Sequence, residues 1–168
     1  MMISTRGRYA LRVLIDLAQH AGEGCVPLKA VSQRQGVSLK YLESIVALLT
    51  KGSLLVSTRG KEGGYRLSRP ASEIFVSQVI HLTEGSLAPV SCLGEDGSPC
   101  QREGVCLTLP MWRRLDQLID DYLSSVSIEM LLEGRAEEAQ SALPRGHPRL
   151  RGLFHPCPPD CAVRENVV

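Results

Sequence analysis

The 168-residue sequence has few aromatic side chains and no long apolar run. Phe, Trp and Tyr make up 4% of it, so aliphatic side chains must fill its core. With 43% hydrophobic and 22% charged residues, it has the composition and length of a globular protein with one good core. No apolar stretch approaches the roughly 20 residues that span a bilayer, and charged residues interrupt the N-terminal apolar positions. We therefore expect a cytoplasmic protein without a membrane segment or a signal peptide.

The sequence also lacks a Cys-x-x-Cys pair, although it contains six cysteines. This disfavours a thioredoxin-like oxidoreductase. Because thiols stay reduced in the cytosol, clustered cysteines there indicate metal binding or redox sensing more than disulfides. No acid–base pair or phosphate-cradling loop is found, since the glycines of RGKEGG fall within a predicted hairpin and not between a strand and a helix. The chain is therefore predicted not to be an enzyme.

The net charge of +1 hides a strong asymmetry along the chain. Through Pro70 there are eleven Lys and Arg against four Asp and Glu, a balance of +7, whereas the remainder has eight against fourteen, a balance of −6. A basic part joined to an acidic part indicates a module that binds a polyanion, attached to a part with another role.

The basic part has the pattern of a winged helix-turn-helix. An amphipathic helix is predicted over 5–20, followed by a short helix after Pro27, a turn at Gly36 and a longer helix with Ser38 as its N-cap. Alternating residues on either side of RGKEGG, within 54–67, predict a β-hairpin. On the first helix, the expected apolar stripe is Tyr9, Ala10, Val13, Leu14 and Leu17, and the expected polar side is Arg8, Arg12, Asp16 and Gln19.

The acidic part is predicted to be helical around a cysteine-containing loop. Apolar residues recur at three and four from Met111 to about Val126, a stripe wide enough to pack on a second copy, and Ser127 caps a last short helix. The predicted fold is mainly α with a small β-hairpin wing and a long C-terminal dimerisation helix. Its expected parts are a winged helix-turn-helix domain (1–70), a connecting helix (71–90), a cysteine loop (91–108), the dimerisation helix with a short terminal helix (109–134) and a poorly ordered tail (135–168).

The second helix of the helix-turn-helix presents side chains suited to a DNA major groove. Glu43 can accept a hydrogen bond from cytosine, while Lys40 and Tyr41 can reach phosphates or base edges. Arg59 and Lys61, at the hairpin tip, suit phosphates or a narrow minor groove. Each fragment alone also fits an ordinary solvated surface, but together with the basic charge they favour double-stranded DNA. The predicted DNA-binding residues are Ser38, Lys40, Tyr41, Glu43, Ser44, Arg59, Gly60, Lys61, Gly63 and Gly64.

Three stretches, ISTRGRYALRVLIDLA, VPLKAVSQRQGVSLKYLE and VSTRGKEGGYRL, closely resemble the Rrf-type winged-helix transcriptional regulators. This family of bacterial repressors and activators includes iron–sulfur (IscR), nitric-oxide (NsrR) and cysteine (CymR) regulators, and the match is nearly collinear over residues 2–134. The resemblance implies a homodimer held by the long helix, bound to a partly palindromic operator. It also implies that Tyr41 and Glu43 read the major groove and that Arg59 reads the minor groove.

Three cysteines, Cys92, Cys100 and Cys106, lie in the polar loop between the predicted helices. Thiolates in such a loop suit iron or zinc. The resemblance, strongest to the IscR-type members, implies that they ligate an iron–sulfur cluster, with [2Fe–2S] favoured over [4Fe–4S] and zinc as the alternative. The predicted function is then sensing of iron–sulfur status, redox state or nitric oxide. A cluster-independent regulator of cysteine or sulfur metabolism, working with a protein partner, remains the other hypothesis.

The fourth ligand is missing from this pattern. Leu109 stands where the resemblance implies a histidine, and Arg8 stands where other relatives carry an acidic residue. Within reach in the sequence are Glu95, Asp96 and Glu103 of the loop and His81 of the preceding helix, none of which the pattern selects. In the tail, Cys157 and Cys161 could bind a metal or form a regulatory disulfide, but their spacing is a weak signal.

Overall fold

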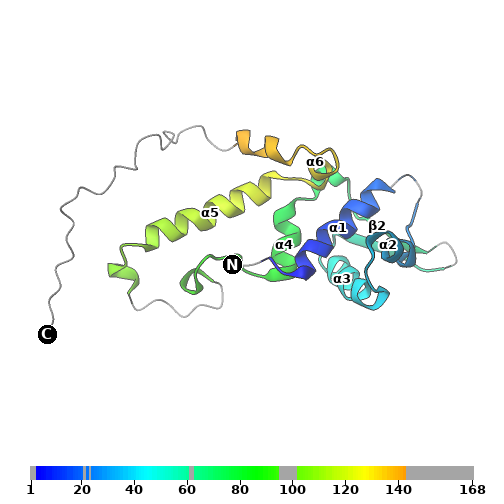
Figure 1. The fold of residues 1–168 in the computed structure, drawn as a ribbon, viewed down its shortest axis with the longest axis horizontal. Helices are drawn as coiled ribbons and strands as arrows, with labels where there is room; N and C mark the ends of the chain where they lie inside the picture. The colour runs from blue at the N-terminus through cyan, green and yellow to red at the C-terminus, as the bar shows by residue number, and fades with distance from the viewer. Residues whose placement is uncertain (1–2, 21, 23, 61–62, 95–101, 143–168) are drawn as a thin grey trace.

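The structure is a computed structural model that describes residues 3–20, 22, 24–60, 63–94 and 102–142 (Figure 1). It is mainly helical with one antiparallel hairpin, which confirms the predicted fold class. The helices are α1 (Thr5–Gln19), α2 (Leu28–Gln35), α3 (Leu39–Lys51), α4 (Val76–Glu84), α5 (Leu109–Ser125) and α6 (Ile128–Leu132), and the strands are β1 (Leu55–Thr58) and β2 (Gly64–Leu67). Short 3-10 turns are η2 (Ala71–Glu73), η3 (Ser91–Leu93), η4 (Glu103–Val105) and η5 (Ala136–Ala142).

Helix α1 lies at the centre of the body and contacts α2, α3, α4, α6 and β2. Its predicted apolar stripe is confirmed, because Ala10, Val13, Leu14 and Leu17 are buried, while Tyr9 is half-buried at the edge of the core. On α3 the buried positions recur at helical spacing: Leu42, Ile45, Val46 and Leu49. As the low aromatic content predicts, aliphatic side chains fill this core. Among the described residues, no helix combines the length and apolar composition that crossing a bilayer requires.

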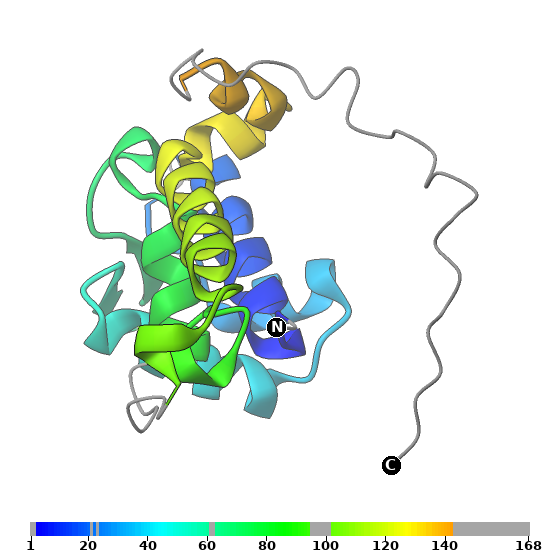
Figure 2. The same ribbon diagram turned by 90° about the vertical axis from the view of Figure 1, so that its left-hand side faces the viewer.

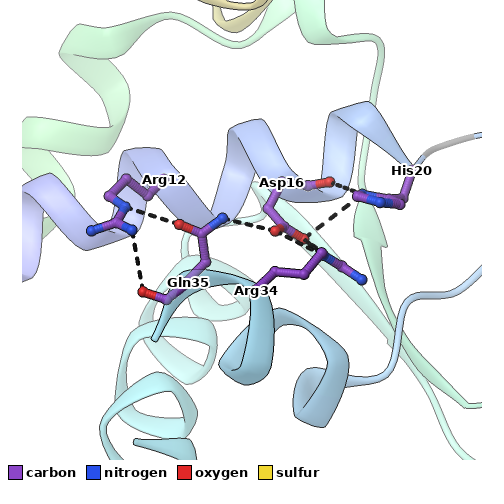
Figure 3. Close-up of polar contacts among 5 residues, drawn as sticks. All are labelled: Arg12, Asp16, His20, Arg34 and Gln35. Atoms are coloured by element: carbon purple, nitrogen blue, oxygen red, sulfur yellow. Dashed lines mark hydrogen bonds and ion pairs between the residues drawn. The ribbon is translucent and has the colours of Figure 1, made fainter. Parts of the chain in front are cut away.

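Asp16 departs from the predicted pattern of α1. It was expected on the polar side of the helix, yet it is only 1% exposed. A carboxylate is costly to bury unless it is paired and hydrogen-bonded. Arg34 of α2 supplies both, donating from Nη2 to Oδ1 at 2.5 Å and from Nε to Oδ2 at 3.0 Å, and Gln35 donates to Oδ2 at 2.8 Å (Figure 3). The expectation failed because the partners come from another helix, which the periodicity of α1 alone does not reveal.

The same network extends along α1 from its middle to its C-terminal end (Figure 3). Towards the C-terminus, the His20 ring approaches the backbone oxygen of Asp16, with Nδ1 2.7 Å away. In the other direction, Gln35 accepts hydrogen bonds from Arg12, from Nε to its side-chain oxygen at 2.9 Å and from Nη2 to its backbone oxygen at 3.2 Å. The C-terminal turn of α2 is therefore attached to two successive turns of α1, at Arg12 and at Asp16.

The wing is joined to the body on two sides. β1 pairs with β2 from Leu55↔Leu67 to Thr58↔Gly64, and Tyr65 exchanges two backbone hydrogen bonds of 2.9 Å with Val26, just before α2. At the other end of the hairpin, Ser53 adopts a left-handed conformation with φ of 56°. Its carbonyl accepts hydrogen bonds from Ser68 and Arg69, and Arg69 also donates to Glu73 and Gln78. The wing is thereby connected to α2 and to α4.

Helix α4 contacts α3 and α1 at two glycines. At the end of α3, Gly52 lies against Leu82 so closely that a Cβ there would overlap the leucine methyls. At the start of α1, Gly7 is buried, and Glu84 accepts hydrogen bonds from the Gly7 backbone at 3.1 Å and the Ser4 hydroxyl at 2.7 Å. The absence of a side chain at these positions permits the close packing of α4 on both helices.

A second apolar cluster joins α4 to the C-terminal helices. It contains Val76, Ile80, Leu87, Val126 and Ala139. The entry to α4 is paired with the segment after α5, through hydrogen bonds from Val76 to Val126 (2.9 Å) and from Ile128 to Ile74 (2.8 Å). Ala136–Ala142, at the start of the segment expected to be a tail, forms a 3-10 turn that contacts α5. Residues 143–168, with Cys157 and Cys161, lie outside the described part of the chain.

Substitution of Asp16 by Asn tests the buried ion pair. We expect the free energy of unfolding at neutral pH to fall by about 2–3 kcal/mol, less than for a fully buried pair because Arg34 is 35% exposed. Burial raises the pKa of Asp16, but hydrogen bonds from Arg34 and Gln35 and the charge of Arg34 outweigh it, so the pKa lies below its ordinary value of 3.8.

This shift gives the stability difference a pH dependence of known sign. A lowered carboxyl pKa stabilises the fold above the unfolded value and loses that contribution as pH falls through the folded pKa. Denaturant unfolding of wild type and Asp16→Asn should therefore show a gap that narrows below pH 3.8. A gap that stays constant into acid would contradict the assigned ion pair.

The α3–α4 contact predicts that Gly52→Ala lowers stability by about 1–2 kcal/mol, because the added methyl must displace Leu82. In a Leu82→Ala background the same change should cost little, since the obstructing side chain is gone. Gly22→Ala is the matched control, because nothing lies within 4 Å of its Cβ position. Equal effects of Gly52→Ala in both backgrounds, measured by thermal unfolding, would rule out this contact.

Candidate DNA-binding surface and cysteine loop

The first turn of α3 presents an exposed polar surface. Ser38 is its N-cap, as predicted, and its hydroxyl accepts a hydrogen bond from the Tyr41 backbone at 3.4 Å. Lys40, Glu43 and Ser44 are exposed on the side away from the core residues of α3. The Ser44 hydroxyl donates to the Tyr41 carbonyl at 2.7 Å, so this serine is partly committed to its own helix. The arrangement leaves the carboxylate of Glu43 and the ammonium of Lys40 exposed, where they could meet a groove edge.

Tyr41 differs from these neighbours because its side chain is half-buried. Its ring meets the ring of Tyr9 on α1 nearly at right angles, with 5.9 Å between the ring centroids. The predicted groove-reading tyrosine is thus also a packing residue, a feature that the sequence pattern of α3 alone does not contain.

The wing tip begins directly after β1. Arg59 is exposed, and Gly60 has a φ of 120°, a conformation open to glycine and rare for other residues. A Cβ on Gly63 would lie 2.5 Å from the Thr58 carbonyl oxygen, and one on Gly64 would overlap the backbone of Val26. The predicted glycines are therefore needed for the hairpin's own geometry. Lys61 lies outside the described residues.

The cysteine loop lies away from the wing. Figure 1 shows η3 and η4, the turns that carry its described parts, and the hairpin towards opposite ends of the long axis. Cys92 is exposed in η3, and Cys106 follows η4 and precedes α5. Cys100 lies outside the described residues, so the three thiols are not seen together.

The N-terminus of α5 favours the thiolate form of Cys106. Hydrogen bonding with the Thr108 hydroxyl (3.4 Å between Sγ and Oγ1), followed by bonds from the backbone of Thr108 and Leu109, lowers the pKa of the Cys106 thiol below its ordinary value, and the charge of Arg102 adds to this. Because the thiolate is the form that binds metals, Cys106 fits the role of a ligand to iron or zinc. The donor set of the loop is chemically suited to such a centre.

The described residues do not supply a fourth ligand. Leu109 is 5% exposed at the start of α5, Glu103 forms an ion pair with Arg113, and His81 is 2.8 Å from Asp120 through Nε2 and 3.2 Å from the Gly85 carbonyl through Nδ1. Within the described ranges, no three His, Cys, Asp or Glu side chains form a group that could hold a metal ion. Glu95 and Asp96 lie outside the described residues.

Two residues that organise this surface were missed by the sequence reasoning. Asp16 was assigned to a polar face, although the neighbouring stripe of Val13, Leu14 and Leu17 is a signal that a carboxylate there lies close to the core. Tyr9 was recognised as apolar but not as a contact of α3. No pattern within either helix could have paired it with Tyr41, because the two are distant in sequence.

Comparison with known proteins gives a consistent answer over most of the chain. Residues 3–134 match the Rrf2 family, described as an iron-dependent transcriptional regulator. The HTH-type transcriptional regulator IscR of Xenorhabdus nematophila is 39% identical over 157 residues, which cover 89% of this chain and 94% of that protein. IscR of Photorhabdus laumondii is 43% identical over 135 residues, covering 80% of this chain and 81% of that protein.

Solved structures agree with these relatives. CymR, the global cysteine regulator of B. subtilis, has a TM-score of 0.65 at 36% identity, covering 80% of this chain and 98% of that one. IscR of T. potens has a TM-score of 0.63 at 38% identity, covering 83% of this chain and 91% of that one. The relatives are transcriptional regulators, which confirms the predicted class and the prediction that the chain is not an enzyme. This chain, with its helix-turn-helix, wing and long C-terminal helix, belongs to the Rrf2 family of transcriptional regulators.

Proposed function

We propose that this regulator binds a double-stranded operator with the first turn of α3 and the tip of the wing. The supporting observation is that Ser38 caps a helix whose Lys40, Glu43 and Ser44 are exposed beside a hairpin ending in an exposed Arg59. N-terminal residues of a recognition helix contact base edges, and an arginine on a wing suits phosphates or a narrow minor groove. Tyr41 and Lys61 complete the proposed contact set with the three wing glycines, which allow a close approach of the backbone.

The proposed regulator is a cytoplasmic homodimer held by α5. This helix leaves Met111 54% and Leu115 38% exposed, and of its residues only Leu109 is buried in the single chain. A second copy of α5 would cover such an apolar stripe. Two copies would present two recognition helices, which suits a partly palindromic operator. In this proposal residues 1–70 bind DNA and residues 109–134 form the dimer interface.

The proposed sensor is an iron–sulfur cluster held by Cys92, Cys100 and Cys106, with [2Fe–2S] favoured over [4Fe–4S] and zinc as the alternative. Support comes from the loop's thiols and from the hydrogen bonds of Thr108 that favour the Cys106 thiolate. When bound, a cluster would supply a centre that responds to iron supply, oxidants or nitric oxide. A site with three protein thiolates and an open or weakly held fourth position suits a labile sensor.

The proposed route from the cysteine loop to DNA runs through α4. This helix ends shortly before Cys92, its Leu82 lies on Gly52 at the end of α3, and its Glu84 binds the start of α1. A change in the loop that shifts α4 would move both helices of the DNA-binding module. Regulation then requires that the two states of the loop differ in operator affinity.

A cluster-independent regulator of cysteine metabolism is the second candidate. Two observations favour it: Leu109 is buried where a histidine ligand would be needed, and the fold is similar to that of CymR. In that case α3 and the wing would bind DNA in the same way, and a protein partner would replace the cluster as the signal.

Operator binding is tested with Arg59→Ala. The variant should lose about 1–3 kcal/mol of binding free energy, roughly tenfold or more in Kd, for duplexes that the wild type selects from a randomised pool. Arg135→Ala is the control, because its side chain pairs with Glu133 and Glu138 far from the wing in the sequence. Fluorescence anisotropy at a fixed salt concentration measures the Kd of each variant for the selected duplex. Undiminished binding by Arg59→Ala would exclude the wing as a DNA contact.

The cluster is tested by anaerobic reconstitution with iron and sulfide. Wild type should take up iron and sulfide and show the visible absorption of a cluster. We expect this absorption to be lost in each of three variants, Cys92→Ala, Cys100→Ala and Cys106→Ala. Cys25→Ala, outside the loop, is the matched control and should retain it. Wild type that takes up neither element refutes the cluster and favours the second candidate. Equal operator affinity of loaded and unloaded protein would refute the sensing step alone.

A further inference from the structure

Among the proposed DNA contacts on α3, Tyr41 is the one whose side chain packs against another helix. Lys40, Glu43 and Ser44 project from α3 into solvent, whereas the Tyr41 ring is half-buried against Tyr9 of α1. The two rings are 5.9 Å apart between centroids with an 89° angle between their planes. This is the edge-to-face geometry that aromatic pairs prefer, and it restricts both the position and the tilt of each ring.

Tyr9 is held in turn by a cation. The Arg12 guanidinium carbon lies over the Tyr9 ring, 4.9 Å from its centroid, within the range of a cation–π contact. Arg12 is itself fixed, because Nε and Nη2 donate to the side-chain and backbone oxygens of Gln35. Figure 3 shows these two bonds and the next one, from the Gln35 amide to buried Asp16.

The contacts therefore form one continuous chain from the core to the recognition helix. Asp16 holds Gln35, Gln35 holds Arg12, Arg12 covers Tyr9, and Tyr9 meets Tyr41. Each link uses a group with a preferred orientation: a carboxylate, a planar amide, a planar guanidinium or an aromatic ring. Such a chain fixes direction more strongly than aliphatic packing, which has no directional preference.

We infer that Tyr9, held in place by Arg12, is a positioning residue for DNA recognition that fixes the Tyr41 ring at the start of α3. This inference rests on the proposed operator binding by Tyr41. The pair acts on the first turn of α3, the part of a recognition helix that contacts base edges. Tyr9 thus contributes to the choice of operator without contacting DNA.

A role in core packing alone makes a different prediction. A packing residue would lower stability and would reduce binding to all duplexes in proportion to the folded fraction. A positioning residue reduces the affinity for the selected operator and leaves the salt-dependent affinity for unrelated duplexes unchanged, because phosphate contacts supply the latter. The ratio of the two affinities therefore separates the two roles.

The experiment uses full-length protein and two probes, the duplex that wild type selects from a randomised pool and a scrambled duplex of the same length and composition. Tyr9→Leu should weaken selected-duplex binding by about three- to tenfold, the size expected for one aromatic pair, and leave scrambled-duplex binding unchanged. Tyr9→Phe keeps the ring and should bind as wild type does. Arg12→Lys keeps the charge but loses the planar contacts, so it should show a smaller loss of the same kind.

A double-mutant cycle completes the test. In a Tyr41→Leu background, Tyr9→Leu should produce no further loss of selectivity, because the ring that it positions is absent. Thermal unfolding of every variant verifies that it is folded at the assay temperature. If Tyr9→Leu does not fold, the selectivity of Arg12→Lys tests the inference instead, because Arg12 is exposed on α1. Unchanged selectivity of the folded variants, or equal losses with and without the Tyr41 ring, would overturn the inference. Failure of wild type to select any duplex would instead overturn the proposed operator binding.

Discussion

The helix-turn-helix depends on a carboxylate that is buried away from water. Asp16 is buried on α1, and its charge is tolerable only while Arg34 and Gln35 of α2 supply hydrogen bonds. Aliphatic packing in the same core would tolerate small shifts between these helices, because the hydrophobic effect has no direction. A buried ion pair with an added hydrogen bond from the Gln35 amide tolerates such shifts poorly, since each hydrogen bond has a narrow range of lengths and angles. These bonds therefore restrict how α2 can lie against α1.

The geometry of α1 relative to α2 then has consequences at both ends of the molecule. Towards α3, Gln35 and Arg12 extend the network to the aromatic pair at the first turn of that helix. Towards the cysteine loop, the start of α1 receives Glu84 of α4. Figure 2, which looks along α5, shows α1 and α4 side by side beneath that helix. Helix α1 therefore packs both against α3, which carries the proposed DNA contacts, and against α4, which leads to the proposed sensor.

Much of the fold could be predicted from local patterns. The apolar stripes of α1 and α3, the caps at Ser38 and Ser127 and the glycine-rich hairpin all depend on residues close together in sequence, and each was confirmed. The features that local patterns did not reveal depend on partners from elsewhere: the burial of Asp16 by Arg34, the Tyr9–Tyr41 contact and the turn formed by η5 against α5. At the proposed cluster, the cysteines were recognisable by type and spacing. The fourth ligand was not, because, of the candidates named, Glu103 and His81 are paired with Arg113 and Asp120, and Glu95 and Asp96 lie outside the described residues.

The pairing of β2 with Val26 has a consequence for how copies of the protein can associate. With Val26 on one side of β2 and β1 on the other, β2 is an interior strand, and within the described residues the outer side of the sheet is the four-residue β1. Exposed strand edges are templates for unwanted pairing between chains, and proteins limit this by keeping such edges short. Here the edge ends at an arginine and a glycine turn, so backbone-to-backbone recruitment of a second chain is disfavoured. This is consistent with the proposed association through the face of α5, where side-chain shape can select the partner.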